Sequence, residues 1–340
     1  MQENTGFQNY LDSIFSHVYY FYLYSMARKY GYCCINMSLG NDLPKKDRIT
    51  TNRSMTKKTF LERGIEYASE LALLNVKDLY KIIQWNHENG IRMYRMSSDM
   101  FPWFSEYEIQ DLRDYTEISE TLASCGELAL NTGQRITFHP SPYSVLASLR
   151  EDVVANSVKE LRQHAEIMDL MGLPQNCYYP INIHVNTTQP SKEEAAERFC
   201  NNFELLPDSV KRRLVVEIDD KGSQYTSVDL RDLIHKKIGI PVTFDYLHNI
   251  CNPPEGLTEK ESLEVCLSTW PAGMVPLTHF SESRKLFEDE SAKQLAHSDW
   301  INKKIETYGL DFDIELEVKM KEKALLQYNS NIEQILWQEI

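Results

Sequence analysis

The sequence predicts an α/β protein built as a single (β/α)8 TIM barrel, in which eight parallel strands alternate with helices. From Tyr32 onward, short apolar runs alternate with longer amphipathic stretches, as expected of strand-helix units around a parallel sheet. Eight such units fit the chain better than a doubly wound sheet does. A length of 340 residues is compatible with two domains, but no linker, repeat or low-complexity segment divides the chain.

Eight short apolar runs are the expected strands. In chain order they span residues 31–36, 92–96, 135–138, 179–184, 214–217, 241–245, 274–279 and 312–315. Amphipathic stretches between them predict helices at 57–89, 152–171, 192–205, 227–237, 259–267 and 298–307. Gly90 ends the first of these helices.

The barrel is expected to span residues 30–328, between an N-terminal extension (1–29) and a C-terminal tail (329–340). The apolar aromatic run at 14–27 is too short for a membrane span and is interrupted by Ser16 and His17. Its upstream flank carries Glu3 and Asp12 and no basic residue, unlike a signal peptide. We expect this extension to pack on the barrel, and we expect no membrane partner.

Composition limits the possible partners. The chain has 36 Lys and Arg against 50 Asp and Glu, a formal charge of −14, which disfavours uniform attraction to phosphate. Nucleic acid would need a local basic surface or metal ions that reverse the sign of an acidic pocket. Glycine is scarce, at 13 residues, and no phosphate-binding glycine motif occurs, so no nucleotide cofactor is expected.

The seven cysteines are scattered and include no C-x-x-C pair. This spacing argues against a zinc or redox centre based on thiols. Cysteine usage of this kind indicates a reducing, intracellular compartment.

Polar residues that can bind metals stand at six successive strand ends, where a barrel brings residues from distant parts of the chain together. They are His139, His184, Glu217, Asp245, His248, His279 and Glu317. Imidazole and carboxylate ligands without thiolate suit Mn, Zn or Fe. Carboxylates that bridge ions favour a cluster of two or three metals, and such clusters hydrolyse phosphodiesters. Sugar isomerases use related barrels and metals, so both reactions remain open at this point.

Besides metal ions, the loop after the first strand is a possible source of positive charge. Residues 44–58 contain six basic side chains against Asp47, a net charge of +5, and include Asn52 and Arg53. Beside the metal-binding face, such a loop is expected to contact DNA phosphates. If the loop lay away from the metal-binding face, we would expect it to be an ordinary solvated loop.

Ten sequence motifs follow one another along the predicted strands and their ends. They are GYCCIN (31–36), TTNRS (50–54), WNHENGIRMYRMSSDMFPW (85–103), TFHP (137–140), NIHV (182–185), VVEIDDK (215–221), VTFDYLHN (242–249), THFSESR (278–284), LAHSDW (295–300) and DIELEVKMKEKA (313–324). Together they resemble the ultraviolet-damage endonuclease family, from about residue 31 to residue 327.

The resemblance implies a (β/α)8 barrel carrying a cluster of two or three divalent ions, Mn²⁺ in type. It implies an endonuclease that nicks DNA immediately 5′ of pyrimidine dimers, 6-4 photoproducts and abasic sites, leaving 3′-hydroxyl and 5′-phosphate ends. The seven strand-end residues would be the metal ligands, with Glu217, Asp245 and Glu317 as the catalytic carboxylates. We expect a monomer acting on double-stranded DNA in a nucleus, a nucleoid or a viral particle.

The resemblance also implies residues that bind DNA or the lesion. Tyr32 and Asn36 would line the pocket for extruded nucleotides, although Tyr32 could instead belong to the barrel core. Tyr143 would enter the gap left by the damaged bases. Asp99 could bind a metal or the catalytic water. His297 could be a further site residue, or it could hold the ligands in position without binding a metal.

Two positions depart from the family pattern. Leu277 stands where family members can carry a lysine that is modified into an extra anionic ligand. Pro142 stands where the family usually has a glutamine, so the hydrogen bonds of that glutamine are lost beside Tyr143. Three other functions compete with the leading one: an abasic-site endonuclease of the endonuclease IV type, a metal-dependent sugar isomerase, and a damage-binding protein without catalysis.

Overall fold

The computed structural model describes residues 28–40, 42–44 and 47–338, with side chains described through residue 331. The expected N-terminal extension therefore lies outside the described residues except for its last two positions. Lys45 and Lys46 of the basic loop also lie outside them.

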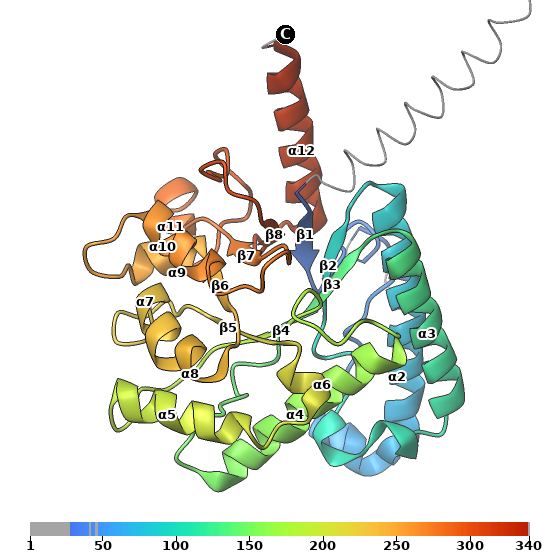
Figure 1. The fold of residues 1–340 in the computed structure, drawn as a ribbon. Coiled ribbons are helices and arrows are strands. Elements are labelled where there is room, and N and C mark those ends of the chain that lie inside the picture. The colour runs from blue at the N-terminus through green and yellow to red at the C-terminus, as the bar shows by residue number, and fades with distance from the viewer. Residues whose placement is uncertain (1–27, 41, 45–46, 339–340) are drawn as a thin grey trace, which may run out of the picture.

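Eight parallel strands close into a barrel in sequence order, with β8 beside β1 (Figure 1). Their bounds are β1 Tyr30–Cys33, β2 Met93–Met96, β3 Arg135–Phe138, β4 Ile181–Ile183, β5 Leu214–Glu217, β6 Val242–Asp245, β7 Leu277–Phe280 and β8 Asp313–Leu316. The predicted (β/α)8 barrel is confirmed, and all eight predicted strands occur. Two of them, β3 and β5, have the predicted bounds, and the ends of the other six differ by at most three residues.

Helices surround the barrel and fill the connections. They are α2 Lys57–Glu88, α3 Tyr115–Asn131, α4 Glu151–Leu170, α5 Lys192–Phe203, α6 Asp208–Lys211, α7 Ser227–Leu230, α8 Lys236–Ile238, α9 Tyr246–Cys251, α10 Glu259–Leu267, α11 Arg284–Phe287 and α12 Lys321–Gln338. Short 3-10 turns occur at η2 Phe104–Glu106 and η3 Ile109–Asp111, and a π-helical turn at η4 Arg231–His235. None of the helices in the described part of the chain is long and apolar enough to cross a membrane.

The helix predicted at 298–307 is wrong, because this segment is an irregular connection between β7 and β8. Two carboxylates earlier in the same connection bind backbone N–H groups of this segment and hold it in its irregular path. Glu288 accepts from the N–H of Asp299 at 2.6 Å and of Trp300 at 2.9 Å. Glu282 accepts from the N–H of Asn302 at 2.7 Å.

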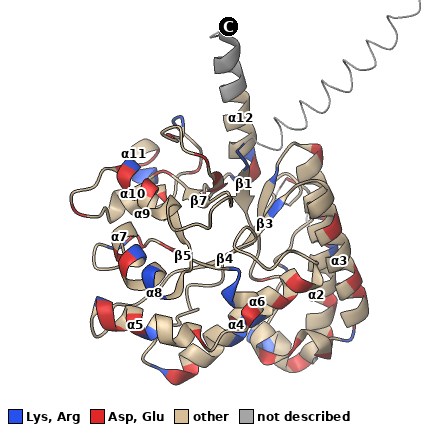
Figure 2. Ribbon diagram, viewed as in Figure 1, with Lys and Arg blue, Asp and Glu red and all other residues tan. Residues whose placement is uncertain are grey.

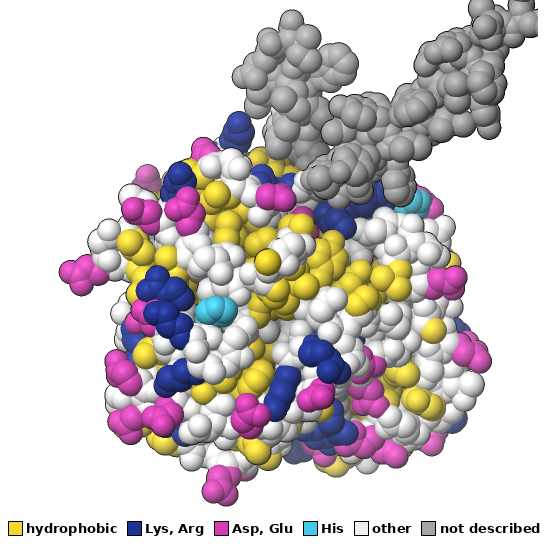
Figure 3. Space-filling model, viewed as in Figure 1, with side chains coloured by type: hydrophobic (Ala, Val, Ile, Leu, Met, Phe, Trp, Pro, Cys, Tyr) yellow, Lys and Arg dark blue, Asp and Glu magenta, His cyan; other side chains and the backbone are white. Residues whose placement is uncertain are grey.

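Helix α3 was not among the predicted helices, although its buried face repeats at helical spacing through Ile118, Leu122, Cys125 and Ala129. It packs against α2 on the outside of the sheet (Figure 1). The outer helices carry both acidic and basic side chains (Figure 2). On the face seen in Figure 3, both signs of charge are interspersed with hydrophobic side chains.

Gly31 allows the first two strands to lie unusually close together. A Cβ at this position would come within 2.5 Å of the Met93 carbonyl oxygen, so a side chain would force β1 and β2 apart. The close approach matters for function because β1 and β2 carry Cys33 and Arg95, which pair in register. Both residues take part in the polar network of the barrel interior.

Candidate metal centre

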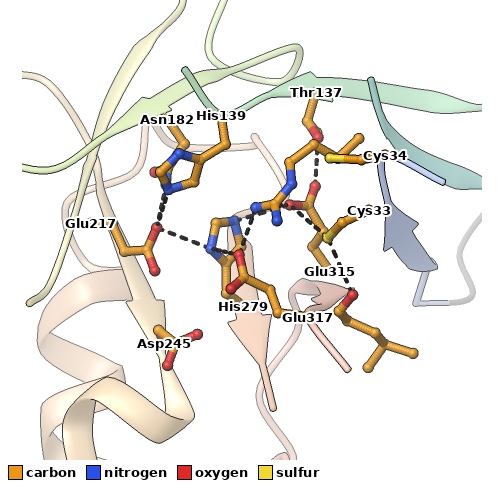
Figure 4. A network of polar contacts seen from close by, with 12 residues as sticks. Cys33, Cys34, Thr137, His139, Asn182, Glu217, Asp245, His279, Glu315 and Glu317 are labelled. Atoms are coloured by element: carbon orange, nitrogen blue, oxygen red, sulfur yellow. Dashed lines mark hydrogen bonds and ion pairs between the residues drawn. The ribbon is translucent and has the colours of Figure 1, made fainter. Parts of the chain in front are cut away.

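Glu217 is the hub of the polar cluster at the carboxyl ends of the strands. It ends β5 and is fully buried. Its Oε2 lies 3.1 Å from Nε2 of His139 and 3.0 Å from Nδ1 of His279. His184 and His248 approach the same carboxylate at 3.6 and 3.3 Å. Figure 4 shows His139 and His279 converging on Glu217 from different strands.

Asp245 forms a second part of the cluster. It ends β6 and caps α9, because its Oδ1 accepts a 2.7 Å hydrogen bond from the N–H of His248. This cap starts a helical turn that brings the His248 ring towards Glu217. The sequence motif FDYLH therefore encodes both a ligand pair and the turn that orients it.

Glu317 closes the cluster on the side of β8. Its Oε1 lies 3.4 Å from Nδ1 of His279. His297 also reaches this residue, with Nδ1 at 3.1 Å from the Glu317 carbonyl oxygen and 3.7 Å from Oε2. The structure thus brings all seven predicted ligands together and places His297 beside them.

The electrostatics of the cluster favour cations. Burial raises the pKa of Glu217, but the surrounding histidines, His279, His184 and His139, together outweigh burial and hold this pKa well below its usual range. Burial lowers the pKa of His279, while the Glu217 and Glu315 carboxylates outweigh burial and raise it to about 9. Burial raises the pKa of Asp245. The carboxylates therefore draw positive charge to the strand ends.

Two carboxylate oxygens in the cluster are available to a metal. Glu217 Oε1 and Asp245 Oδ2 are buried and have no hydrogen-bond partner within the described residues. Two sets of side chains hold ligand atoms within 4.8 Å of one another, namely His139 with His184 and Glu217, and Glu217 with Asp245 and His248. These oxygen and nitrogen donors fit a divalent metal of the first transition row.

Three residues that support the predicted ligands were missed at the sequence level. Asn182 donates its side-chain N–H to Glu217, and Asp219 Oδ1 lies 3.1 Å from Nδ1 of His184. Arg95 contacts Glu317 at 2.6 Å. Asn182 lies two residues from His184, and Asp219 two residues from Glu217. This period-two spacing is the signal that could have found Asn182 and Asp219, whereas no local pattern marks Arg95.

Tyr32 and Asn36 lie in the core rather than at the surface. The Tyr32 hydroxyl donates to Asn86 of α2 at 2.8 Å and accepts from the Asn36 side chain at 2.9 Å. Both residues are buried, so this conformation offers neither side chain to DNA. The placement agrees with the barrel-core alternative for Tyr32.

The predicted phosphate-binding loop uses Arg53 internally. Its guanidinium lies 2.5 Å from Asp78 of α2 and donates to the carbonyls of Arg48 and Thr50. The half-buried Asn52 accepts a hydrogen bond from the Thr50 hydroxyl. Arg53 therefore stabilises the loop, and its exposed basic side chains within the described residues are Arg48, Lys57 and Lys58.

Of the remaining predicted positions, three are exposed and one is buried. Tyr143 is 83% exposed, and Pro142 beside it is also exposed. Asp99 is exposed, and in the described part of the chain its carboxylate makes no contact with the seven ligands. Leu277 is buried among apolar residues, which include Met93 and Val215. This apolar setting is consistent with leucine at a position where family members can carry a modified lysine as an extra anionic ligand.

The fold and the site define a TIM barrel whose strand ends carry residues able to hold metal ions. The model of the UV-endonuclease UvdE family matches residues 28–338, and the chain belongs to this family. The resemblance seen in the strand-end motifs is thereby confirmed.

Several known proteins are similar to the chain. The UV-damage endonuclease of Schizosaccharomyces pombe is 32% identical over 87% of this chain, which spans about half (49%) of that protein. The putative UV-damage endonuclease of Acanthamoeba polyphaga mimivirus is 30% identical, over 87% of this chain and 89% of its own length. The crystal structure of SacUVDE superposes with a TM-score of 0.77 at 28% identity, covering 91% of this chain and 99% of its own.

We predict that Mn²⁺ stabilises the chain through Glu217. At a free Mn²⁺ concentration about 100 times the dissociation constant, one bound ion adds about 2.7 kcal/mol to the free energy of unfolding. Glu217→Gln should lose most of this gain, as measured by urea unfolding with and without Mn²⁺.

Glu282→Gln is the matched control, because Glu282 is also a buried carboxylate but bonds to Asn302 outside the cluster. This variant should keep the full gain. An equal Mn²⁺ effect in wild type and Glu217→Gln would remove Glu217 from the ligand set.

Proposed function

We propose that this chain is a metal-dependent DNA endonuclease that nicks the damaged strand immediately 5′ of UV photoproducts and abasic sites. It would leave 3′-hydroxyl and 5′-phosphate ends and act as a monomer without a nucleotide cofactor. The observation that carries the proposal is the buried ring of imidazoles and carboxylates at the strand ends, in a chain of the UvdE family.

The ring would hold two or three divalent ions, with Mn²⁺ as the expected metal. When bound, such ions activate water and stabilise the attacking and leaving oxygens of a phosphodiester. Glu217, Asp245 and Glu317 would hold the ions and balance their charge. The four histidines of the ring would add nitrogen ligands without adding negative charge.

Neighbouring side chains would set the orientation of these ligands. Asp219 faces Nδ1 of His184, which directs Nε2 of the same ring towards Glu217. The Asn182 amide binds one Glu217 oxygen and leaves the other oxygen, Oε1, for a metal. His297 holds the backbone of Glu317 at 3.1 Å and so limits the movement of that carboxylate.

Lesion selection would depend on how easily the DNA deforms. A photodimer stacks and pairs poorly, so extruding it costs less than extruding normal bases. The Tyr143 ring, in the loop after β3, is exposed, and it would stack in the resulting gap. Lys57 and Lys58, exposed at the start of α2, would contact phosphates and so fix the position of the duplex.

The direct test is a nicking assay with Mn²⁺ and two supercoiled plasmids, one irradiated with ultraviolet light and one untreated. We expect conversion of the irradiated plasmid to the open circle, with nicks mapping immediately 5′ of dipyrimidine sites. Equal nicking of both plasmids, or of neither, would contradict the proposal. Nicking of only abasic DNA would instead favour an endonuclease IV type of activity.

Tyr143→Ala should reduce incision at photodimers about ten-fold or more, because stacking on an aromatic ring contributes about 1–3 kcal/mol per base. Incision at an abasic site should fall less, since no damaged base has to be extruded there. Rates on two synthetic duplexes, one carrying a photodimer and one an abasic site, measure the difference.

Tyr80→Ala is the control, because Tyr80 is also partly exposed but lies on the outer helix α2. This variant should incise both duplexes at the wild-type rate. If Tyr143→Ala slows both substrates equally, Tyr143 does not act as a wedge at the lesion.

A further inference from the structure

A third group of possible metal ligands lies beside the cluster, deeper in the barrel. Cys33, Glu315 and Glu317 hold ligand atoms within 4.8 Å of one another. Glu315 is fully buried on β8, and Thr137 donates its hydroxyl to one of its oxygens. Figure 4 shows Cys33 and Thr137 on the two sides of Glu315. Two carboxylates in such a place require a positive charge.

Arg95 already supplies that charge. Its Nη1 lies 3.0 Å from Oε1 of Glu315 and 2.6 Å from Oε1 of Glu317, so one nitrogen bridges both carboxylates. The position follows from the strand register, in which Arg95 pairs with Cys33 on β1 and with Thr137 on β3. A guanidinium stays charged at every physiological pH, so this cation cannot be lost by titration.

We propose that Arg95 is a permanent cation that takes the place of a divalent ion between Cys33, Glu315 and Glu317. It is a positioning residue, because it acts on the metal centre through Glu317. Arg95 binds Oε1 of Glu317, the oxygen that also lies 3.4 Å from Nδ1 of His279, while Oε2 lies on the side of His297. Arg95 thereby places the boundary of the metal centre at Glu317 and limits the number of ions bound.

The inference rests on the metal centre of the proposed function, but it is tested without DNA. The chain is stripped of metal with a chelator and titrated with Mn²⁺, and the bound ions are counted by calorimetry and by metal analysis after desalting. Arg95→Gln should bind one more ion per chain than wild type, because an ion can then occupy the space between the two glutamates. Its thermal midpoint should rise more with Mn²⁺ than that of wild type.

Two further variants separate the roles of charge and ligand. Arg95→Lys keeps a cation at this position and should bind the wild-type number of ions. Arg95→Gln combined with Glu315→Gln leaves the internal charge unchanged but removes a carboxylate ligand, and it should also bind the wild-type number. Arg213→Gln is the matched control, because Arg213 is also buried and pairs with Asp169 at 2.7 Å, outside the cluster. This variant should bind the wild-type number of ions.

A folded Arg95→Gln with the wild-type number of ions would overturn the proposal, as would an extra ion in the lysine variant or the double variant. An Arg95→Gln chain that stays unfolded even with Mn²⁺ would also overturn it, because the ion is expected to replace the lost charge. A wild-type chain that binds Mn²⁺ but leaves irradiated DNA intact would defeat only the proposed function.

Discussion

The structure depends on the need to neutralise carboxylates buried inside a barrel. Taking an unpaired carboxylate out of water costs several kcal/mol, so each of these groups needs a cation or strong hydrogen bonds. Near the start of β8, Asp313 is paired with Arg135 at 2.9 Å. Two residues further along, Glu315 is paired with Arg95. At the strand ends, histidines surround Glu217, and metal ions would complete the compensation.

This arrangement explains how a polar interior and a stable fold coexist. The apolar core lies largely outside the sheet, where the outer faces of the strands pack against the surrounding helices. The inner faces of the strands are therefore free to carry charged residues at every second position. Because the candidate ligands lie in the strands, directly after them or in the first turn of α9, their geometry depends little on long loops. A net charge of −14 disfavours uniform attraction of the whole surface to DNA.

Much of this was predictable, because strands and their ends leave local signals. Apolar runs marked the eight strands, and polar residues at the strand ends or shortly after them marked the seven candidate ligands. The failures arose where distant residues decide the structure. The irregular segment at 298–307 depends on Glu282 and Glu288, and Arg53 turns inward because Asp78 lies on another element. The bridging role of Arg95 requires the register of β2 against β1 and β3, which no local pattern reveals.

Two kinds of cation would compensate the buried carboxylates: exchangeable metal ions at Glu217 and Asp245, and the fixed guanidinium of Arg95 at Glu315. Anomalous diffraction at the manganese absorption edge, from crystals grown with Mn²⁺, distinguishes the two. We expect anomalous peaks within ligand distance of Glu217 and Asp245, and none between Cys33 and Glu315. Absence of peaks at Glu217 and Asp245, or a peak in the place of the Arg95 guanidinium, would contradict this expectation.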